Sequence, residues 1–121
     1  MASGDYIGEG GRINYTAGTT AVSKGDVVVV RSGATGMIGV AIDDIAASGT
    51  GPVAIEGVFK ITKSTATATG IFSVGDSLYW DVAGGHINSQ ASANVPAGIC
   101  MEAAAAAATT VKIKLVPSKA T

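Results

Sequence analysis

The chain has 121 residues, enough for one domain with a hydrophobic core. Its formal net charge is −1 and only 14% of its residues are charged, whereas an average soluble domain has about 25%. The basic residues are scattered, which argues against a nucleic-acid-binding surface, and the low surface charge favours a protein that is partly covered by neighbouring molecules. No apolar window of about 18 residues predicts a membrane-spanning helix, and residues 1–5 lack the features of a secretory signal.

The chain begins with a segment that offers little to bury. Residues 1–10 are rich in glycine and contain two acidic residues, so they are expected to form an extended N-terminal arm. We expect a single β domain over residues 11–121.

The rest of the chain alternates between apolar segments and clusters of Gly, Ser, Thr and Asn, a pattern typical of all-β sandwiches and barrels. In the two clearest segments, 52–61 and 111–115, apolar and polar residues alternate, so each strand should have one apolar face. The expected strands, in chain order, are 11–16, 26–31, 37–41, 52–61, 77–80, 86–88, 97–101 and 111–115.

Two parts of the sequence resemble each other. Ser23-Lys24-Gly25-Asp26 is answered by Ser73-Val74-Gly75-Asp76, and the segment 38–47 is answered by 97–106. Two copies are too few for a solenoid. We therefore predict a compact barrel-like or sandwich-like body, of the β-tulip or SH3-like kind, built from pseudo-repeats at about 22–60 and 72–115. The Gly-Asp pairs are interpreted as turns. A calcium site is disfavoured, because no further acidic residues follow at the required spacing.

Two connections need separate treatment. The alanine run 103–108 has high helix propensity, but it is too short for a stable isolated helix. The equivalent stretch of the first repeat, 46–51, is rich in Gly, Ser and Thr, so we expect a loop with at most a single helical turn. The Thr- and Ala-rich segment 63–70 is expected to be an exposed connection.

The sequence offers little for catalysis or metal binding. The single histidine, His86, is interpreted as a surface turn residue, and the single cysteine, Cys100, as a small buried hydrophobe. The acidic pair 43–44 could work with Glu102 as acid and base, but acidic residues at strand ends are the simpler interpretation. The pair 79–80 (Tyr-Trp) should place one ring in the core, because neighbouring strand residues point to opposite faces. We predict no catalytic, cofactor-binding or metal-ligating residue, and no enzyme activity.

The order of the short motifs resembles a known family. The series runs from Ile13-Asn14-Tyr15-Thr16 through 22–29, 39–46 and 51–59 to Val74-Gly75-Asp76 and the closing segment 109–115. It is similar to the small capsid decoration, or cement, proteins of tailed bacteriophages, over about residues 11–115. Some members of that family have been labelled RecA/RadA-type recombinases. The absence of a phosphate-binding Gly-x-x-x-x-Gly-Lys-[Ser/Thr] loop argues against that label here.

The resemblance implies a non-enzymatic protein that binds the outer surface of the phage head and stabilises the expanded shell against DNA pressure. Its partners would be the major capsid protein and further copies of itself, as a homotrimer or alternatively a homodimer, without nucleic acid, membrane or cofactor. It would be made in the host cytoplasm and end on the capsid exterior of the virion. The alternative is a carbohydrate- or surface-binding β-module of a phage particle, with an exposed aromatic cluster around Tyr79, Trp80 or Tyr15. The residues expected to contact the capsid are Ala2, Ser3, Gly4, Asp5, Tyr6, Ile7, Arg12 and Tyr15.

Overall fold

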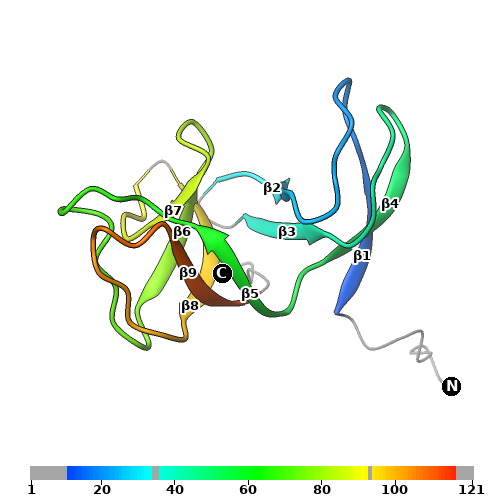
Figure 1. Cartoon of the computed structure of the whole chain (residues 1–121). Coiled ribbons are helices and arrows are strands. Elements are labelled where there is room, and N and C mark those ends of the chain that lie inside the picture. Colours follow the sequence, from blue (N-terminus) through cyan, green and yellow to red (C-terminus); the bar gives the residue numbers. More distant parts are fainter. Residues whose placement is uncertain (1–10, 34–35, 93, 117–121) are drawn as a thin grey trace, which may run out of the picture.

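The chain folds into two curled antiparallel sheets, shown in Figure 1. A computed structural model describes residues 11–33, 36–92 and 94–116, which form nine strands and no helix. The all-β class predicted from the sequence is confirmed, while the expected arm at 1–10 lies outside the described residues. The strands are β1 (Arg12–Thr16), β2 (Val27–Arg31), β3 (Met37–Ala41), β4 (Thr50–Ala54), β5 (Gly57–Thr62), β6 (Ser77–Asp81), β7 (His86–Asn88), β8 (Val95–Cys100) and β9 (Thr110–Leu115).

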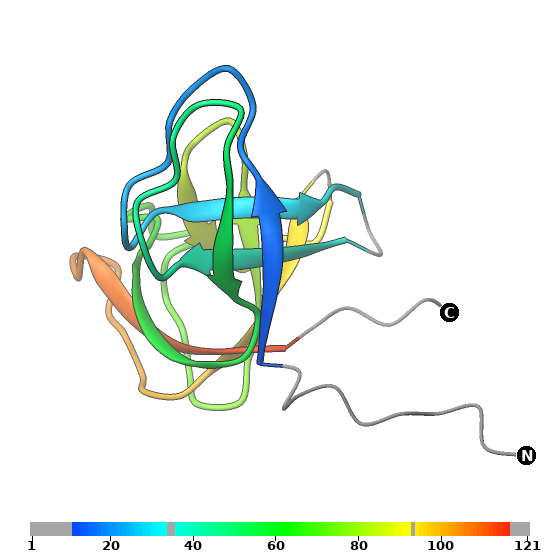
Figure 2. The same cartoon turned by 90° about the vertical axis from the view of Figure 1, so that its right-hand side faces the viewer.

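The two sheets have the same strand order, apart from one extra strand. The first runs β1-β4-β3-β2 and the second runs β5-β9-β8-β6, followed by β7 at the outer side of β6. Figure 2, turned by 90°, shows how strongly the sheets curl. An isolated parallel bridge between Lys63 and Ile87 brings β7 beside the end of β5. The second sheet is therefore almost closed on itself, whereas no strand of the described residues joins β2 to β1.

Each sheet encloses a hydrophobic cluster, and β2 and β3 lie between the two. The larger cluster contains Phe72, Leu78, Ile87 and Ile113, and Ile38 and Val40 of β3 belong to it as well. The smaller one gathers residues of the first sheet around Val53. Along β2, Val27 and Val29 pack against the larger cluster, while Val28 and Val30 pack against the smaller one. Alternate side chains of one strand thus belong to two cores, as the pleat dictates.

The prediction of one strand over 52–61 is wrong, because the segment divides between the two sheets. β4 ends at Ala54, and β5 begins at Gly57, which has a φ of 114° that a residue with a side chain rarely adopts. The predicted alternation of buried residues does not persist through the break, since Val53, Ala54 and Ile55 are buried in succession and Gly57 is exposed. Ile55 packs in the smaller cluster, and Ile61 packs in the larger one. The other strands lie within two residues of their predicted bounds.

The two Gly-Asp pairs form turns with matching geometry. Gly25 and Gly75 have φ angles of 91° and 93°. The carboxylates of Asp26 and Asp76 each accept a hydrogen bond from the backbone N–H of the serine three residues earlier, at 3.0 and 2.8 Å. The predicted turns are confirmed. That the two halves derive from one duplicated unit remains a prediction.

The two predicted connections differ in outcome. The alanine run 103–108 is a loop, as predicted, with one turn closed by a hydrogen bond from the Ala108 N–H to the Ala105 carbonyl at 3.1 Å. The segment 63–70 is only partly exposed, so that prediction is wrong in part. Lys63, Ser64 and Gly70 are buried, because this segment packs against β7 and the alanine loop.

Candidate functional site

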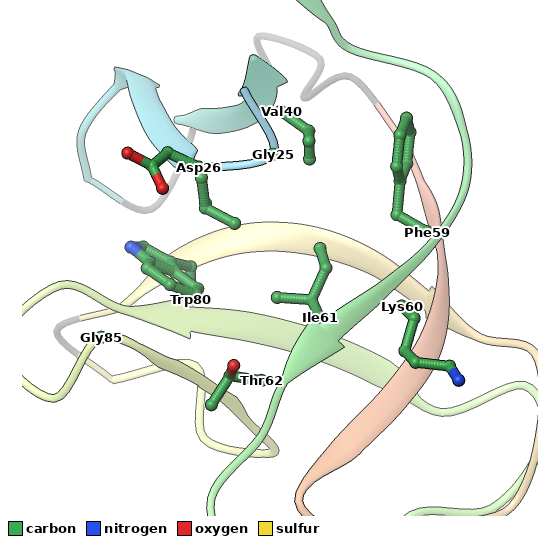
Figure 3. A pocket seen from close by; sticks show the side chains of 10 residues that line it. Gly25, Asp26, Val40, Phe59, Lys60, Ile61, Thr62, Trp80 and Gly85 are labelled. Atoms are coloured by element: carbon green, nitrogen blue, oxygen red, sulfur yellow. The ribbon is translucent and has the colours of Figure 1, made fainter. Parts of the chain in front are cut away.

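A pocket of about 340 Å³ lies between the two sheets and is shown in Figure 3. Apolar side chains of both sheets line it, among them Val40, Ile61 and Trp80, together with the polar groups of Asp26 and Lys60. Figure 3 shows the Lys60 amine pointing away from Trp80. The described residues that line the pocket include neither a nucleophile–base pair nor a set of metal ligands.

A second depression, of about 470 Å³, runs along the free edge of β2. We call it the β2 groove. It is lined by Tyr15, residues 18–22 of the β1–β2 connection and Val27, Val28 and Val29. The described residues that line it carry no charged side chain, and one wall is β2, which within the described part of the chain pairs only with β3. A groove of this kind suits an extended polypeptide better than a small polar substrate.

The outer face of the second sheet combines lysines with exposed apolar side chains. In the strand register Val58, Lys114 and Ile99 form one row across β5, β9 and β8, and Lys60 is paired with Lys112 in the next. We call this surface the lysine face; its residues are Val58, Lys60, Ile99, Met101, Lys112 and Lys114. Val58 is 54% exposed and Met101 43%. Exposed apolar side chains that lie together in this way can mark a contact surface.

Two of the residues predicted to contact the capsid are described by the structure. Arg12 and Tyr15 both lie on β1, but on opposite faces. The Arg12 side chain is exposed, whereas Tyr15 packs against the smaller cluster and lines the β2 groove. The other predicted contacts, Ala2 to Ile7, lie outside the described residues.

The side chains considered for catalysis are not brought together into a reactive set. His86 pairs with Asp81 of its own hairpin, with 3.6 Å between Nε2 and Oδ2. Cys100 is fully buried, as predicted, and its thiol donates to the Glu102 carbonyl at 3.1 Å. The Glu102 carboxylate forms an exposed ion pair with Lys112. Asp44 instead accepts a hydrogen bond from the backbone N–H of Lys24 at 2.8 Å.

Of the aromatic residues proposed for a carbohydrate site, Trp80 and Tyr15 line different depressions. Trp80 packs against the larger cluster and lines the pocket between the sheets, so one ring of the 79–80 pair is indeed in the core. Tyr15 belongs to the other sheet and lines the β2 groove. The two rings therefore do not form one stacking platform.

Lys63 is a polar residue whose burial the sequence did not suggest. Its side chain is only 3% exposed, and its ammonium donates to the carbonyls of Ser64, Ala106 and Ala108 at 2.7, 3.2 and 2.8 Å. The ammonium also lies 5.5 Å from the centre of the Phe72 ring. Burial lowers the pKa of Lys63. These bonds hold the alanine loop to the barrel, which is a structural role.

Within the described ranges no group of three or more His, Cys, Asp or Glu side chains could hold a metal ion, and no helix is long and apolar enough to cross a membrane. The fold is all-β, with a groove beside β2 in the first sheet and the exposed lysine face on the second. A family model described as phage cement protein matches residues 7–115. The chain belongs to the phage cement protein family. It is a structural protein of the phage capsid, so its location is the virion and its partner the capsid. No curated protein and no solved structure matches the chain.

Proposed function

We propose that the protein binds the outside of the phage head and stabilises the expanded shell against the pressure of the packaged DNA. Membership of the cement protein family, over residues 7–115, is the observation that carries this proposal. The architecture supports it, since β2 and β3 join two cores into one body that can transmit force between neighbouring capsid subunits. The protein acts by binding and not as an enzyme, and it is made in the host cytoplasm before it joins the head.

We further propose that the capsid contact is formed by Ala2 to Ile7 with Arg12 and Tyr15, in a homotrimer of the protein. The exposure of Arg12 and the position of Tyr15 beside the β2 groove support a contact at β1, an edge strand of the first sheet. Repeated weak contacts around a symmetric oligomer add up to tight binding through avidity. The low charge of the chain agrees with a surface that is largely covered on the particle.

The direct test is to mix purified protein with undecorated expanded capsids and image the particles. We expect stoichiometric density on the outer surface at local threefold positions, and decorated heads that release their DNA at a higher temperature than bare ones. Density at local twofold positions would replace the trimer with a dimer. No binding to expanded heads would contradict the proposed function.

A matched pair of charge reversals locates the contact. Arg12→Glu changes the first sheet beside the arm, and Lys114→Glu makes the same change on the lysine face of the second sheet. Both side chains are exposed, so neither change should unfold the protein. We expect Arg12→Glu to reduce capsid occupancy and Lys114→Glu to leave it unchanged. The reverse result would assign the contact to the lysine face.

A further inference from the structure

We propose that β1 binds the capsid by accepting an extended segment of the major capsid protein as a new strand along its outer edge. This inference rests on the proposed function, because it specifies how the capsid contact at β1 is made. β1 pairs with β4 on one side and with no strand of the described residues on the other. Figure 1 shows β1 and β4 together at one end of the molecule, and in Figure 2 they lie in front of β2 and β3.

The hydrogen bonds between β1 and β4 determine which backbone groups of β1 face outward. The Gly11 carbonyl accepts a hydrogen bond from the Ile55 N–H at 3.0 Å, and the Ala17 N–H donates to the Gly49 carbonyl at 2.8 Å. Backbone groups alternate in direction along a strand, and those of residues 11 and 17 both face β4. The N–H and C=O groups of residues 12, 14 and 16 therefore point away from β4, toward the outer edge.

The position of Pro52 leads independently to the same result. Pro52 lies opposite Asn14 in the register of β1 and β4, and a proline has no N–H to donate. Its carbonyl accepts a hydrogen bond from the Ile42 N–H at 3.3 Å, so it points away from β1. The N–H and C=O of Asn14 therefore cannot bond to Pro52, and they are available to a strand on the outer side.

The outer edge of β1 lacks the features that commonly prevent strand addition. Edge strands are often protected by a proline, a bulge or several charges. β1 pairs with β4 over five consecutive residues without a shift in register, it contains no proline, and its one charged residue, Arg12, lies at its end. A regular edge of this kind can bond to an extended segment through the main chain.

The other free edge of the first sheet, that of β2, is less suitable for a large partner. It faces the β2 groove, and residues 18–22 form another wall of that groove, so an added strand would have to fit between two walls. At β1 the side chains of Arg12, Asn14 and Thr16 are all exposed. A segment on the surface of a capsid can therefore reach the edge of β1 more easily.

The side chains of β1 specify the chemistry of the incoming segment. Ile13 and Tyr15 pack against the smaller cluster, so the residues opposite them should be apolar. Arg12, Asn14 and Thr16 lie on the exposed face, and within the described residues Arg12 forms no ion pair. We therefore expect an acidic residue opposite Arg12. In the antiparallel pairing that both sheets use, the capsid segment would read polar, apolar, polar, apolar, acidic from its N-terminal end.

A second copy of β1 fits this edge less well than a capsid segment does. Two identical antiparallel strands pair about a twofold axis, which would place Asn14 opposite itself and Arg12 opposite Thr16. Arg12 would then face no carboxylate, and the threefold axis of the proposed homotrimer does not generate such a contact. The capsid, the partner of the cement protein family, has neither restriction.

The first test removes one outward N–H while it preserves the bonds to β4. In full-length Asn14→Pro the ring replaces this N–H, a change that an edge strand tolerates, whereas Asn14→Ala removes only the side chain. Both variants and the unsubstituted protein are mixed with undecorated expanded capsids. We expect the capsid affinity of Asn14→Pro to fall about tenfold, as for one lost hydrogen bond, and that of Asn14→Ala to stay unchanged.

The outcomes of this test separate the two proposals. Unchanged affinity of Asn14→Pro, or equal losses in both variants, would overturn strand addition and leave the proposed function intact. Failure of the unsubstituted protein to bind would contradict the proposed function itself.

The second test measures amide hydrogen exchange in the unsubstituted protein and so does not depend on a variant that folds. The amides of Asn14 and Thr16 should exchange about tenfold more slowly, or slower still, on the capsid than in the free protein. Those of Ile13 and Tyr15, which face β4, should change little. No slowing on the capsid would overturn the proposal. Slow exchange of Asn14 and Thr16 in the free protein would overturn it too, and would assign the edge to a second copy if it required high concentration, or to the chain's own residues if it did not.

Discussion

The ammonium of Lys63 donates a hydrogen bond to the carbonyl of Ala108 over 2.8 Å, across 45 positions of sequence. Two further carbonyls, of Ser64 and Ala106, complete its surroundings, and the Phe72 ring lies beneath it. The Lys63 ammonium, at the end of β5, thus supplies hydrogen bonds to two carbonyl groups of the alanine loop, which is not part of a β-strand. Lys63 therefore holds the end of the alanine loop, while a backbone bridge between Ala104 and Phe72 holds its beginning.

Replacing Lys63 by Met should destabilise the protein. Met fills a similar volume but leaves three carbonyl groups without a donor, and unsatisfied buried polar groups cost about 1–3 kcal/mol. Lys112→Met is the control, because Lys112 is 49% exposed and its ion pair with Glu102 is worth about 1 kcal/mol or less. Urea denaturation should show a clear loss for the first variant and little change for the second. Equal losses would contradict a structural role for Lys63.

The lowered pKa of Lys63 also predicts a pH dependence of stability. The unfolded chain binds the Lys63 proton more tightly than the folded chain does. The free energy of unfolding should therefore rise as the pH increases from the folded pKa toward the ordinary lysine value of 10.5. Denaturation of the native protein and of Lys63→Met across this range isolates the effect, since the rise should be missing from the variant. A rise that persists in Lys63→Met would have to come from another group.

The turns at Gly25 and Gly75 should respond alike to substitution. Both residues have φ near +90°, and an added Cβ would meet no atom within 4 Å at either position. The cost of Gly→Ala is then conformational strain alone, about 1–2 kcal/mol at each turn. Gly11→Ala is the matched control, since it too has open space but no positive φ. Thermal or urea unfolding of the three variants measures the comparison, and a loss at Gly11 as large as at the turns would refute the strain argument.

Cys100 should react with thiol reagents only when the whole domain opens. Its side chain is completely buried in the larger cluster, next to Ile113 in the neighbouring strand. The labelling rate should therefore follow global unfolding as denaturant is added. An exposed cysteine introduced at Val82 gives the rate for a freely accessible thiol. Fast labelling of native Cys100 would show that β8 and β9 separate locally.

Features that depend on a few neighbouring residues, such as most single strands and the tight turns, were predicted correctly from the sequence. The alternation of Val111, Ile113 and Leu115 with lysines identified β9 because a strand's faces can be inferred from its own residues. The Gly-Asp turns were found for the same reason. The break before Gly57 was missed, since apolar residues continue to alternate through it and only the positive φ of one glycine reveals the change of sheet.

The burial of Lys63 and the β2 groove were harder to predict, because each depends on segments that are far apart in the sequence. Lys63 at the end of a strand resembles an ordinary solvated lysine, and only its packing against the alanine loop makes it buried. The β2 groove depends on the curl of the first sheet, which brings Tyr15 near β2 although the two strands are at opposite ends of the sheet order. The sequence identified Tyr15 as a contact residue, but it could not identify the residues of β2 that lie near Tyr15 in the groove.

The position of β2 and β3 between two hydrophobic clusters affects how the protein unfolds under heat or mechanical force. Val28 and Val29 are neighbours in sequence, yet each belongs to a different cluster. Neither cluster can be opened without exposing part of the other, so the two sheets cannot melt one after the other as separate domains would. We therefore expect both clusters to unfold together in one cooperative transition, at a single temperature or force, and to stay intact below it.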